Sequence, residues 1–340
     1  MRRLRDVRQA IADGGDRGPL PVFLTVDTEA WPRRGTAWPN TGRAEIARDI
    51  LGTTSGGEYG VRYQLNRFKE YRLRASYFVE ALSIGVMGAM PIREIIDTIR
   101  DHDQRVELHA HSEWLPYIPS SPCPNFAGQH FDQLSLEHQA GVIERSLEYF
   151  AQCGVDHVKA FRAGNFTANR DTLQALGTFG VKYDSSLNIA YTRGRFPRLE
   201  LTYPTATRGI CEVPVSWFVD GLRRHRPAHL AACSAPELSG ALWQAWQAAW
   251  PAFVIVMHSF DLLSGARTAA DDTMLLRFER LCRFLAAHPD KFRTVTFDDV
   301  VPADMLPAWR FRRPLRSSIR RTLGRSREQI VRRYRDLTGA

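Results

Sequence analysis

The chain has 340 residues, 44% of them hydrophobic and 24% charged, which is the balance of a globular rather than a disordered chain. This length is sufficient for one large core, such as a single α/β barrel. The formal net charge of +9 lies entirely in residues 310–340, where eleven arginines face two acidic residues. The rest of the chain is close to neutral, so its core is not expected to bind nucleic acid.

The spacing of the cysteines and the hydropathy of the chain indicate in which cellular compartment the protein is expected. The cysteines follow no CxxC spacing, which argues against a disulfide framework or a thiolate zinc site and fits a reducing compartment. They are Cys123, Cys153, Cys211, Cys233 and Cys282. Residues 1–19 are basic but lack an apolar run, so we expect a flexible segment rather than a secretory signal. We also see no apolar stretch of ~20 residues, the length that spans a bilayer. A cytoplasmic location is therefore expected.

Strand and helix patterns alternate along the chain. Apolar, β-rich runs predict strands at 21–26, 75–79, 106–108, 158–161, 181–183, 212–217, 253–257 and 294–297. Amphipathic segments predict helices at 63–71, 91–100, 135–153, 169–179, 238–250 and 273–287. Residues 31–60 are rich in Gly, Thr, Pro and Arg and predict a long loop, a candidate lid. Helices between strands indicate βαβ units around a parallel sheet, so we expect one α/β domain over residues 20–303 and a tail over 304–340.

Polar residues stand where several of these strands end. They are Asp27, Glu29, His109, His111, Arg162 and His258. The carboxyl ends of parallel strands meet at one edge of the sheet, so these side chains should converge. Two imidazoles and one or two carboxylates are what a catalytic zinc needs. Each residue alone has an ordinary interpretation, such as a helix cap, a surface charge or a buried histidine, but their recurrence at strand ends favours a site.

Five segments, in this order, resemble the motifs of the polysaccharide deacetylase family (carbohydrate esterase family 4). They are LTVDTE at 24–29, SYFV at 76–79, ELHAHS at 107–112, FRAGNF at 161–166 continuing to YDSS at 183–186, and VMH at 256–258. The resemblance spans roughly residues 20–300. It implies a distorted, incomplete (β/α)7-type barrel and a divalent metal, usually Zn²⁺.

The resemblance assigns the acids of the first motif. It implies that Asp27 is the general base. The metal-binding acid of the family normally follows directly, where this sequence has Thr28, and Glu29 is the substitute that the sequence offers. Asp27 could itself bind the metal.

The histidine motif departs from the family in a second place. The resemblance implies that His111 is the first histidine ligand. Its usual partner four residues on is replaced by Leu115, and His109 on the same strand face could take its place. The resulting hypothesis is a metal held by Glu29, His109 and His111.

The remaining matches concern acid–base chemistry. Arg162 matches the arginine that pairs with the base carboxylate, and His258 matches the histidine that acts as general acid. Glu212 or Asp184 is a candidate for orienting His258, although neither lies in a clean copy of the fourth family motif.

These roles imply metal-dependent hydrolysis of an N-acetyl or N-formyl group on an amino sugar, in a glycan or a lipid-linked glycan intermediate. The alternative is a catalytically inactive fold of this kind that binds a glycan or a protein partner. Four tryptophans could stack on sugar faces or pack in the core and loops: Trp31, Trp38, Trp114 and Trp217.

The basic tail has its own apolar pattern. Apolar residues recur at helical spacing between arginines at Leu315, Ile319, Leu323, Ile330, Tyr334 and Leu337. The pattern fits a basic amphipathic helix or two, and residues 310–340 would then contact an anionic membrane at its inner face. A solvated or disordered cationic tail is the alternative. Nucleic acid is not the expected partner, because Phe311 and Tyr334 are the only aromatic residues within residues 310–340.

Overall fold

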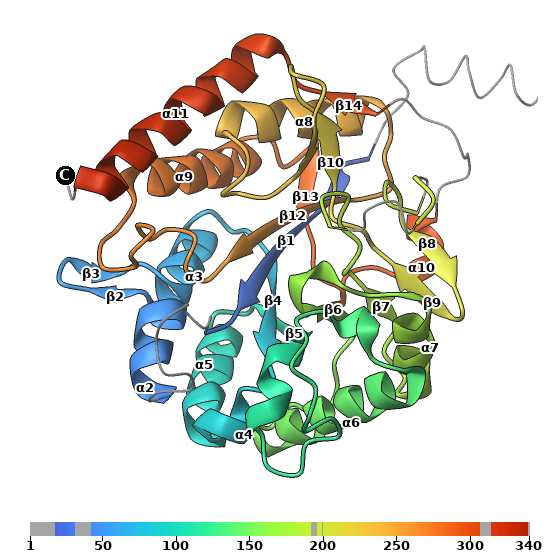
Figure 1. The fold of residues 1–340 in the computed structure, drawn as a ribbon. Helices are drawn as coiled ribbons and strands as arrows, with labels where there is room; N and C mark the ends of the chain where they lie inside the picture. The colour runs from blue at the N-terminus through green and yellow to red at the C-terminus, as the bar shows by residue number, and fades with distance from the viewer. Residues whose placement is uncertain (1–17, 31–41, 192–195, 199, 307–313, 339–340) are drawn as a thin grey trace, which may run out of the picture.

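The computed structural model describes residues 18–30, 42–191, 196–198, 200–306 and 314–338, and the side chains of 336–338 lie outside this description. Its centre is a curled, mostly parallel sheet with the strand order β12-β1-β4-β5-β6-β7-β9-β8 (Figure 1). Only the β8–β9 pair in this path is antiparallel. The strands are β1 (Leu20–Thr28), β4 (Ala75–Glu80), β5 (Arg105–Ala110), β6 (Ala160–Ala163), β7 (Tyr183–Asp184), β8 (Thr205–Thr207), β9 (Ile210–Glu212) and β12 (Phe253–His258). The predicted incomplete (β/α)7-type barrel is confirmed.

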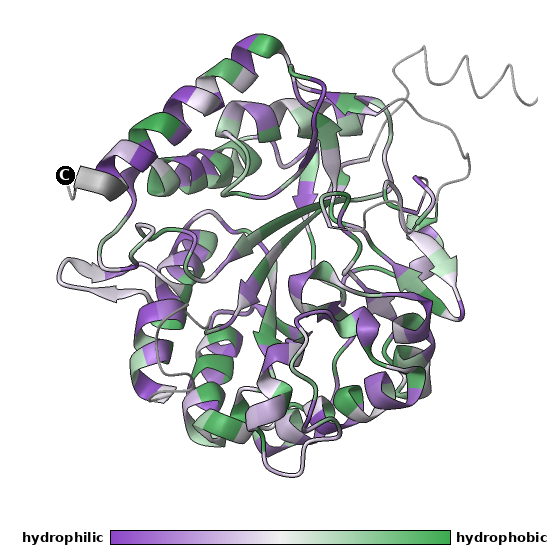
Figure 2. Ribbon diagram, in the orientation of Figure 1, coloured by the Kyte–Doolittle hydropathy of each residue, from purple (hydrophilic) through white to green (hydrophobic). Residues whose placement is uncertain are grey.

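The central strands form because their sequences are apolar on both faces, as a sheet covered on both sides requires. Val22, Phe23, Leu24 and Val26 of β1 are fully buried, and in Figure 2 the middle of the sheet is largely apolar. A further strand, β13 (Phe292–Thr294), pairs with the first residues of β1. The predicted strand at 294–297 therefore lies two residues too late in the chain.

The strand register brings the polar strand ends level with one another. Asp27 of β1 is paired with His258 of β12, and Glu80 of β4 with His109 of β5. His109 is in turn paired with Arg162 of β6. Five strands, β1, β4, β5, β6 and β12, therefore end at one edge of the sheet.

Helices cover the outside of the sheet, each burying one apolar stripe. They are α3 (Val61–Glu70), α5 (Ala89–Asp101), α6 (Leu136–Gln152), α7 (Arg170–Thr178), α8 (Ala235–Gln247) and α9 (Asp272–Ala286). Ser135 caps α6 by accepting a hydrogen bond from the backbone N–H of His138, as its sequence pattern predicts. Helix α5 begins two residues before Pro91, the predicted start.

The predicted long loop at 31–60 is wrong for its second half, and residues 31–41 lie outside the described residues. A short helix, α2 (Gly42–Glu45), continues into a π-helical turn at Ile46–Leu51 and then a hairpin of β2 (Thr53–Thr54) and β3 (Gly57–Glu58). Gly52 ends the turn with φ 65°, and a Cβ there would lie 2.5 Å from the backbone nitrogen of Gly60. The backbone on either side of the hairpin approaches closely at this glycine, a contact that residue propensity does not reveal.

The tail does not extend away from the domain. Strand β14 (Leu315–Arg316) pairs with β10 (Trp217–Val219), which also pairs with β11 (His225–Pro227). Residues 319–338 then form a single helix, α11 (Ile319–Thr338), that lies beside α8 and α9 (Figure 1). The disordered alternative is therefore wrong for this segment. Within the described ranges, no helix has the length and apolar character needed to cross a membrane.

Candidate active site

The six residues from the predicted strand ends meet around one pocket. Five of them line a cavity of about 230 Å³, and Arg162 lies buried behind Asp27. The full lining is Asp27, Glu29, His109, His111, Ala163, Asn165, Phe166, Tyr191, His258, Phe260 and Arg267. The carboxyl ends of β1, β5, β6 and β12 supply the polar groups, as expected for a parallel barrel.

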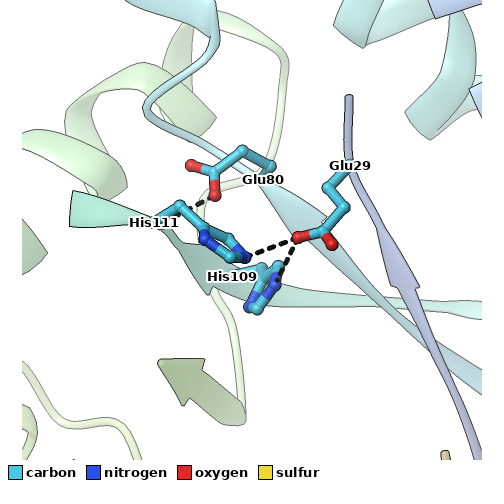
Figure 3. A group of neighbouring side chains, drawn as sticks. All are labelled: Glu29, Glu80, His109 and His111. Atoms are coloured by element: carbon cyan, nitrogen blue, oxygen red, sulfur yellow. Dashed lines mark hydrogen bonds and ion pairs between the residues drawn. The ribbon is translucent and has the colours of Figure 1, made fainter. Parts of the chain in front are cut away.

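A carboxylate and two imidazoles form a buried cluster (Figure 3). One oxygen of Glu29, Oε2, lies 3.0 Å from Nε2 of His109 and 2.6 Å from Nε2 of His111. Glu80 at the end of β4 completes the group, and its Oε2 accepts a 2.7 Å hydrogen bond from the backbone N–H of His111. One potential ligand atom from each of the four residues lies within 4.8 Å of the others.

The hydrogen-bond partners of the histidines determine what can lie between these groups. Nδ1 of His109 faces the backbone carbonyl of Arg162 at 2.7 Å. Because a carbonyl only accepts, Nδ1 must carry the proton, and in a neutral ring Nε2 then directs a lone pair at the Glu29 carboxylate. Two lone pairs in contact require a cation between them, either a proton or a metal ion. This donor set fits a divalent metal such as zinc.

The charges in the cluster support this interpretation. Burial alone would raise the pKa of Glu29, but the two neighbouring histidines outweigh burial and hold it well below its usual range. Burial likewise opposes the charged form of His111, yet Glu29 and Glu113 raise its pKa well above the usual value. Without a metal, the anionic carboxylate therefore holds a proton on His111. A metal ion would supply the same positive charge.

His111 is held by groups that strand-end reasoning did not identify. Its Nδ1 lies 3.2 Å from Oε2 of Glu113, and Asn165 donates a 2.6 Å hydrogen bond to the other oxygen of that carboxylate. Gly164 packs against the imidazole, since a Cβ there would lie 2.5 Å from Cγ of His111. A carboxylate behind a histidine fixes the ring and its tautomer, which is the usual support of a metal-ligating histidine.

The two positions that depart from the family motifs contribute no ligand. Thr28 lies between Asp27 and Glu29 in the sequence, so its side chain points to the opposite face of the strand. Its hydroxyl donates to the carbonyl of Val26 at 3.3 Å. Leu115 is fully buried in the hydrophobic core. Glu29 and His109 occupy the cluster instead.

Asp27 is held by a buried arginine. Nη1 of Arg162 lies 2.5 Å from Oδ1 of Asp27, while its Nε and Nη2 donate to the carbonyl and hydroxyl of Ser185 at 3.0 Å each. The guanidinium also lies 4.3 Å from the ring centroid of Phe78. Arg162 is fully buried, so its position is fixed and Oδ2 of Asp27 is left toward the pocket.

His258 lies opposite this carboxylate, with Nε2 4.0 Å from Oδ2 of Asp27 and 3.9 Å from Oε1 of Glu29. Asp261 accepts from the backbone N–H of His258 at 3.0 Å, and its other oxygen lies 3.5 Å from Nδ1. Burial alone would lower the pKa of His258, but Asp261, Glu29 and Asp27 outweigh burial and raise it to about 9. Asp261 also binds Nε2 of His229 at 3.2 Å.

The prediction that Glu212 or Asp184 orients His258 is wrong. These two buried carboxyls hydrogen-bond each other, and burial raises the pKa of both. Glu212 also accepts from the backbone N–H of Leu187 at 3.1 Å, and Asp184 from the hydroxyl of Ser186 at 2.6 Å. They hold the ends of β7 and β9 together, and Asp261 takes the place beside His258.

The pocket wall is aromatic, but its rings are not the tryptophans considered from the sequence. Trp114 and Trp217 are 2% and 1% exposed and belong to the core, while Trp31 and Trp38 lie outside the described residues. The rings at the pocket are those of Phe166, which stacks on Tyr191 at 5.3 Å, and Phe260, which stacks on His258 at 5.0 Å. Such rings suit contact with the apolar face of a sugar.

Several residues of the site were missed from the sequence. Glu80 directly follows the predicted strand at 75–79, so the strand-end argument could have found it. Glu113 and Asp261 follow site histidines by two and three residues, a spacing too common to be diagnostic alone. Phe166 and Phe260 could not be recognised as pocket residues from the sequence, because residues in loops show no hydrophobic periodicity.

Comparison with solved structures shows what this fold resembles. A putative polysaccharide deacetylase from Mycobacterium smegmatis is 16% identical, with a TM-score of 0.56 over 88% of this chain and 96% of its own. A family 4 carbohydrate esterase from Streptomyces lividans, in complex with acetate, is 15% identical, with a TM-score of 0.42 over 83% and 95% of the two chains. A pseudoenzyme of the same family from Bacillus anthracis is 13% identical, with a TM-score of 0.37 over 82% and 65%.

No protein-family model and no curated protein matches the chain. The likeness to the Mycobacterium smegmatis structure extends over nearly the whole of both chains, and it agrees with the five sequence motifs and their order. The chain therefore has the fold of the polysaccharide deacetylases, and the resemblance expected from the sequence is confirmed at that level.

Proposed function

We propose that the chain is a divergent polysaccharide deacetylase, a metal-dependent hydrolase that removes an N-acetyl or N-formyl group from an amino sugar of a glycan or lipid-linked glycan. One observation carries the proposal. In a single pocket, a donor cluster of Glu29, His109 and His111 lies beside two separately held groups, the Arg162-bound carboxylate of Asp27 and the Asp261-bound imidazole of His258. Metal-dependent amide hydrolysis uses such a division into metal ligands, base and acid.

The residues that would hold the metal are Glu29, His109 and His111. Zn²⁺, or another divalent ion, would polarise the acyl carbonyl and lower the pKa of a bound water toward ~7 when present. Glu80 and Glu113 hold the backbone and the ring of His111, so the chain itself fixes the donors that the ion needs.

The acid–base steps use two groups that line the pocket, Asp27 and His258. Oδ2 of Asp27 accepts the proton of the attacking water, because Oδ1 is already bound by Arg162. The water oxygen forms the new bond to the acyl carbon, and the C–N bond breaks. Nε2 of His258 donates its proton to the departing nitrogen, so the products are a free amine and a small carboxylate.

A deacylation assay tests this function. The purified chain, metal-stripped and reloaded with Zn²⁺ or Co²⁺, would be offered a panel of N-acetylated and N-formylated amino sugars and short glycans. We expect free amine to be released with metal and none without it. If the loaded chain binds sugars but hydrolyses none, it acts as a glycan-binding module and the proposed function is wrong.

The pH profile of this activity should depend on Asp261. His258 acts in its protonated form, so activity should fall as the pH rises through about 9, the pKa to which its neighbours raise it. Asp261→Asn removes a carboxylate that favours the imidazolium, so the basic limb of kcat/KM should move to lower pH. Asp272→Asn removes the same charge from a side chain that is 79% exposed and should leave the limb in place. An unmoved limb in Asp261→Asn would refute the role of Asp261.

A further inference from the structure

Helix α11 packs on the protein through its polar face and leaves its apolar face exposed. Its buried residues are polar: Thr322 is fully buried and Arg325 is 2% exposed. Its largest apolar residues face outward instead. Ile319, Leu323 and Ile330 are 58%, 53% and 67% exposed. An amphipathic helix that packed on the protein through its apolar stripe would bury these side chains.

The inner face is fixed by charge pairs. Arg325 reaches Asp220 and Glu237 at 3.0 Å each, and all three side chains are 0–2% exposed. Thr322 accepts from the backbone N–H of Gly221 at 2.9 Å. Further along, Glu328 binds Arg277 of α9 at 2.8 Å. Contacts of this kind, made where water is excluded, set the rotation of the helix about its axis.

The outer face combines an apolar stripe with arginines. Ile319, Leu323, Ile330 and Tyr334 follow one another at intervals of four, seven and four residues and so lie along one side of the helix. Arginines flank this stripe, and those with exposed side chains beside it are Arg320, Arg327 and Arg333. We call these seven residues the α11 outer face.

We propose that the α11 outer face docks on an anionic lipid surface. Large apolar side chains in a row with flanking arginines are the composition of helices that lie in the membrane interface. A second copy of this chain fits less well, because two such faces would place arginines against arginines. Among the described side chains of α11, the only acidic one is Glu328, which is turned toward Arg277.

The far end of α11 contacts the segment between β12 and α9, which carries part of the pocket wall. Arg332 binds Asp271 and Arg335 binds Asp272 at 3.2 Å, both at the start of α9. The segment that leads from β12 to this point carries Phe260 and Arg267 of the pocket wall. In Figure 1 the C-terminal end of α11 is accordingly on the side where β1 and β12 end. A docked helix would hold the pocket rim near the lipid surface, where membrane-linked glycans are found. This location does not depend on the proposed chemistry.

Vesicle sedimentation of the full chain tests the proposal. Phosphatidylcholine vesicles with and without phosphatidylglycerol would be compared for wild type and for Leu323→Glu with Ile330→Glu. We expect wild type to bind the anionic vesicles and the double variant to bind at least tenfold more weakly. Met90→Glu with Val301→Glu is the matched control, since these residues are also exposed, 65% and 53%, but lie on other elements, and it should bind like wild type.

The second arm concerns charge. Arg320, Arg327 and Arg333 changed together to Gln should weaken binding to the anionic vesicles on the order of a hundredfold and leave thermal unfolding unchanged. Binding that is equal for all variants, or no wild-type binding, would overturn the proposal. A wild-type dimer in sedimentation velocity that Leu323→Glu with Ile330→Glu makes monomeric, without vesicle binding, would instead assign the face to self-association and refute the lipid surface.

Discussion

Asp27→Asn should lower kcat/KM for amide hydrolysis by about 10²–10⁴-fold, the usual contribution of a positioned general base. The amide has nearly the shape of the carboxylate, and its oxygen can still accept from Arg162. It cannot take the proton of the attacking water. The bound metal should stay, because Asp27 is not among the grouped donor atoms of Glu29, Glu80, His109 and His111.

Glu212→Gln is the matched control for this change. Glu212 is a buried carboxyl in the same barrel, but it does not line the pocket, and its partners are Asp184 and the backbone N–H of Leu187. Burial and the neighbouring Asp184 raise its pKa well above the usual value, so the neutral amide should leave activity near wild type. Activity retained in Asp27→Asn, with metal content equal to wild type, would exclude Asp27 as the base.

Arg162→Met should destabilise the fold by about 3–5 kcal/mol, the cost of leaving a buried charge without its partner. Asp27 is only 2% exposed and would lose the guanidinium that neutralises it. The hydroxyl and carbonyl of Ser185 would lose their donors as well. Urea unfolding followed by circular dichroism measures the change. Activity should fall too, since the base carboxylate would no longer be held in position.

A double variant separates this charge effect from a packing defect. With Asp27→Asn already present, Arg162→Met should cost clearly less than in wild type, because no buried anion remains to be compensated. Arg105→Met is the control for losing an ion pair at the surface. Arg105 is 53% exposed and bound to Asp298, so a change within about 0.5 kcal/mol is expected. A similar cost for Arg162→Met and Arg105→Met would contradict the account.

Much of the barrel could be predicted because its central strands are apolar on both faces. Every side chain from Val22 to Val26 is buried, as a strand in the middle of a covered sheet requires, and the same holds for residues 253–257. The segment at 42–58 was missed because its short helix and hairpin depend on a close backbone approach between Gly52 and Gly60. The rotation of α11 was equally hidden. Its apolar spacing was visible, but only the buried pairs of Arg325 decide which side faces inward.

The site was predictable to the extent that it follows strand ends. Asp27, Glu29, His109, His111, Arg162 and His258 were found together because carboxyl ends of parallel strands share one edge of the sheet. Partners that lie in loops were not found by this argument. Asp261 holds His258 from the loop after β12, whereas Glu212 and Asp184, chosen by analogy with the family, pair with each other. Strand position alone does not tell which buried acids form a pair.

The metal centre is the central claim, and metal content measured by elemental analysis tests it most directly. Wild type purified with Zn²⁺ should retain about one ion per chain after gel filtration, while Glu29→Gln and His111→Ala should each retain less than a tenth of that. His157→Ala, a change of an exposed histidine away from the pocket, should retain the ion. Wild type without bound metal after loading, or His111→Ala with as much as wild type, would contradict the account.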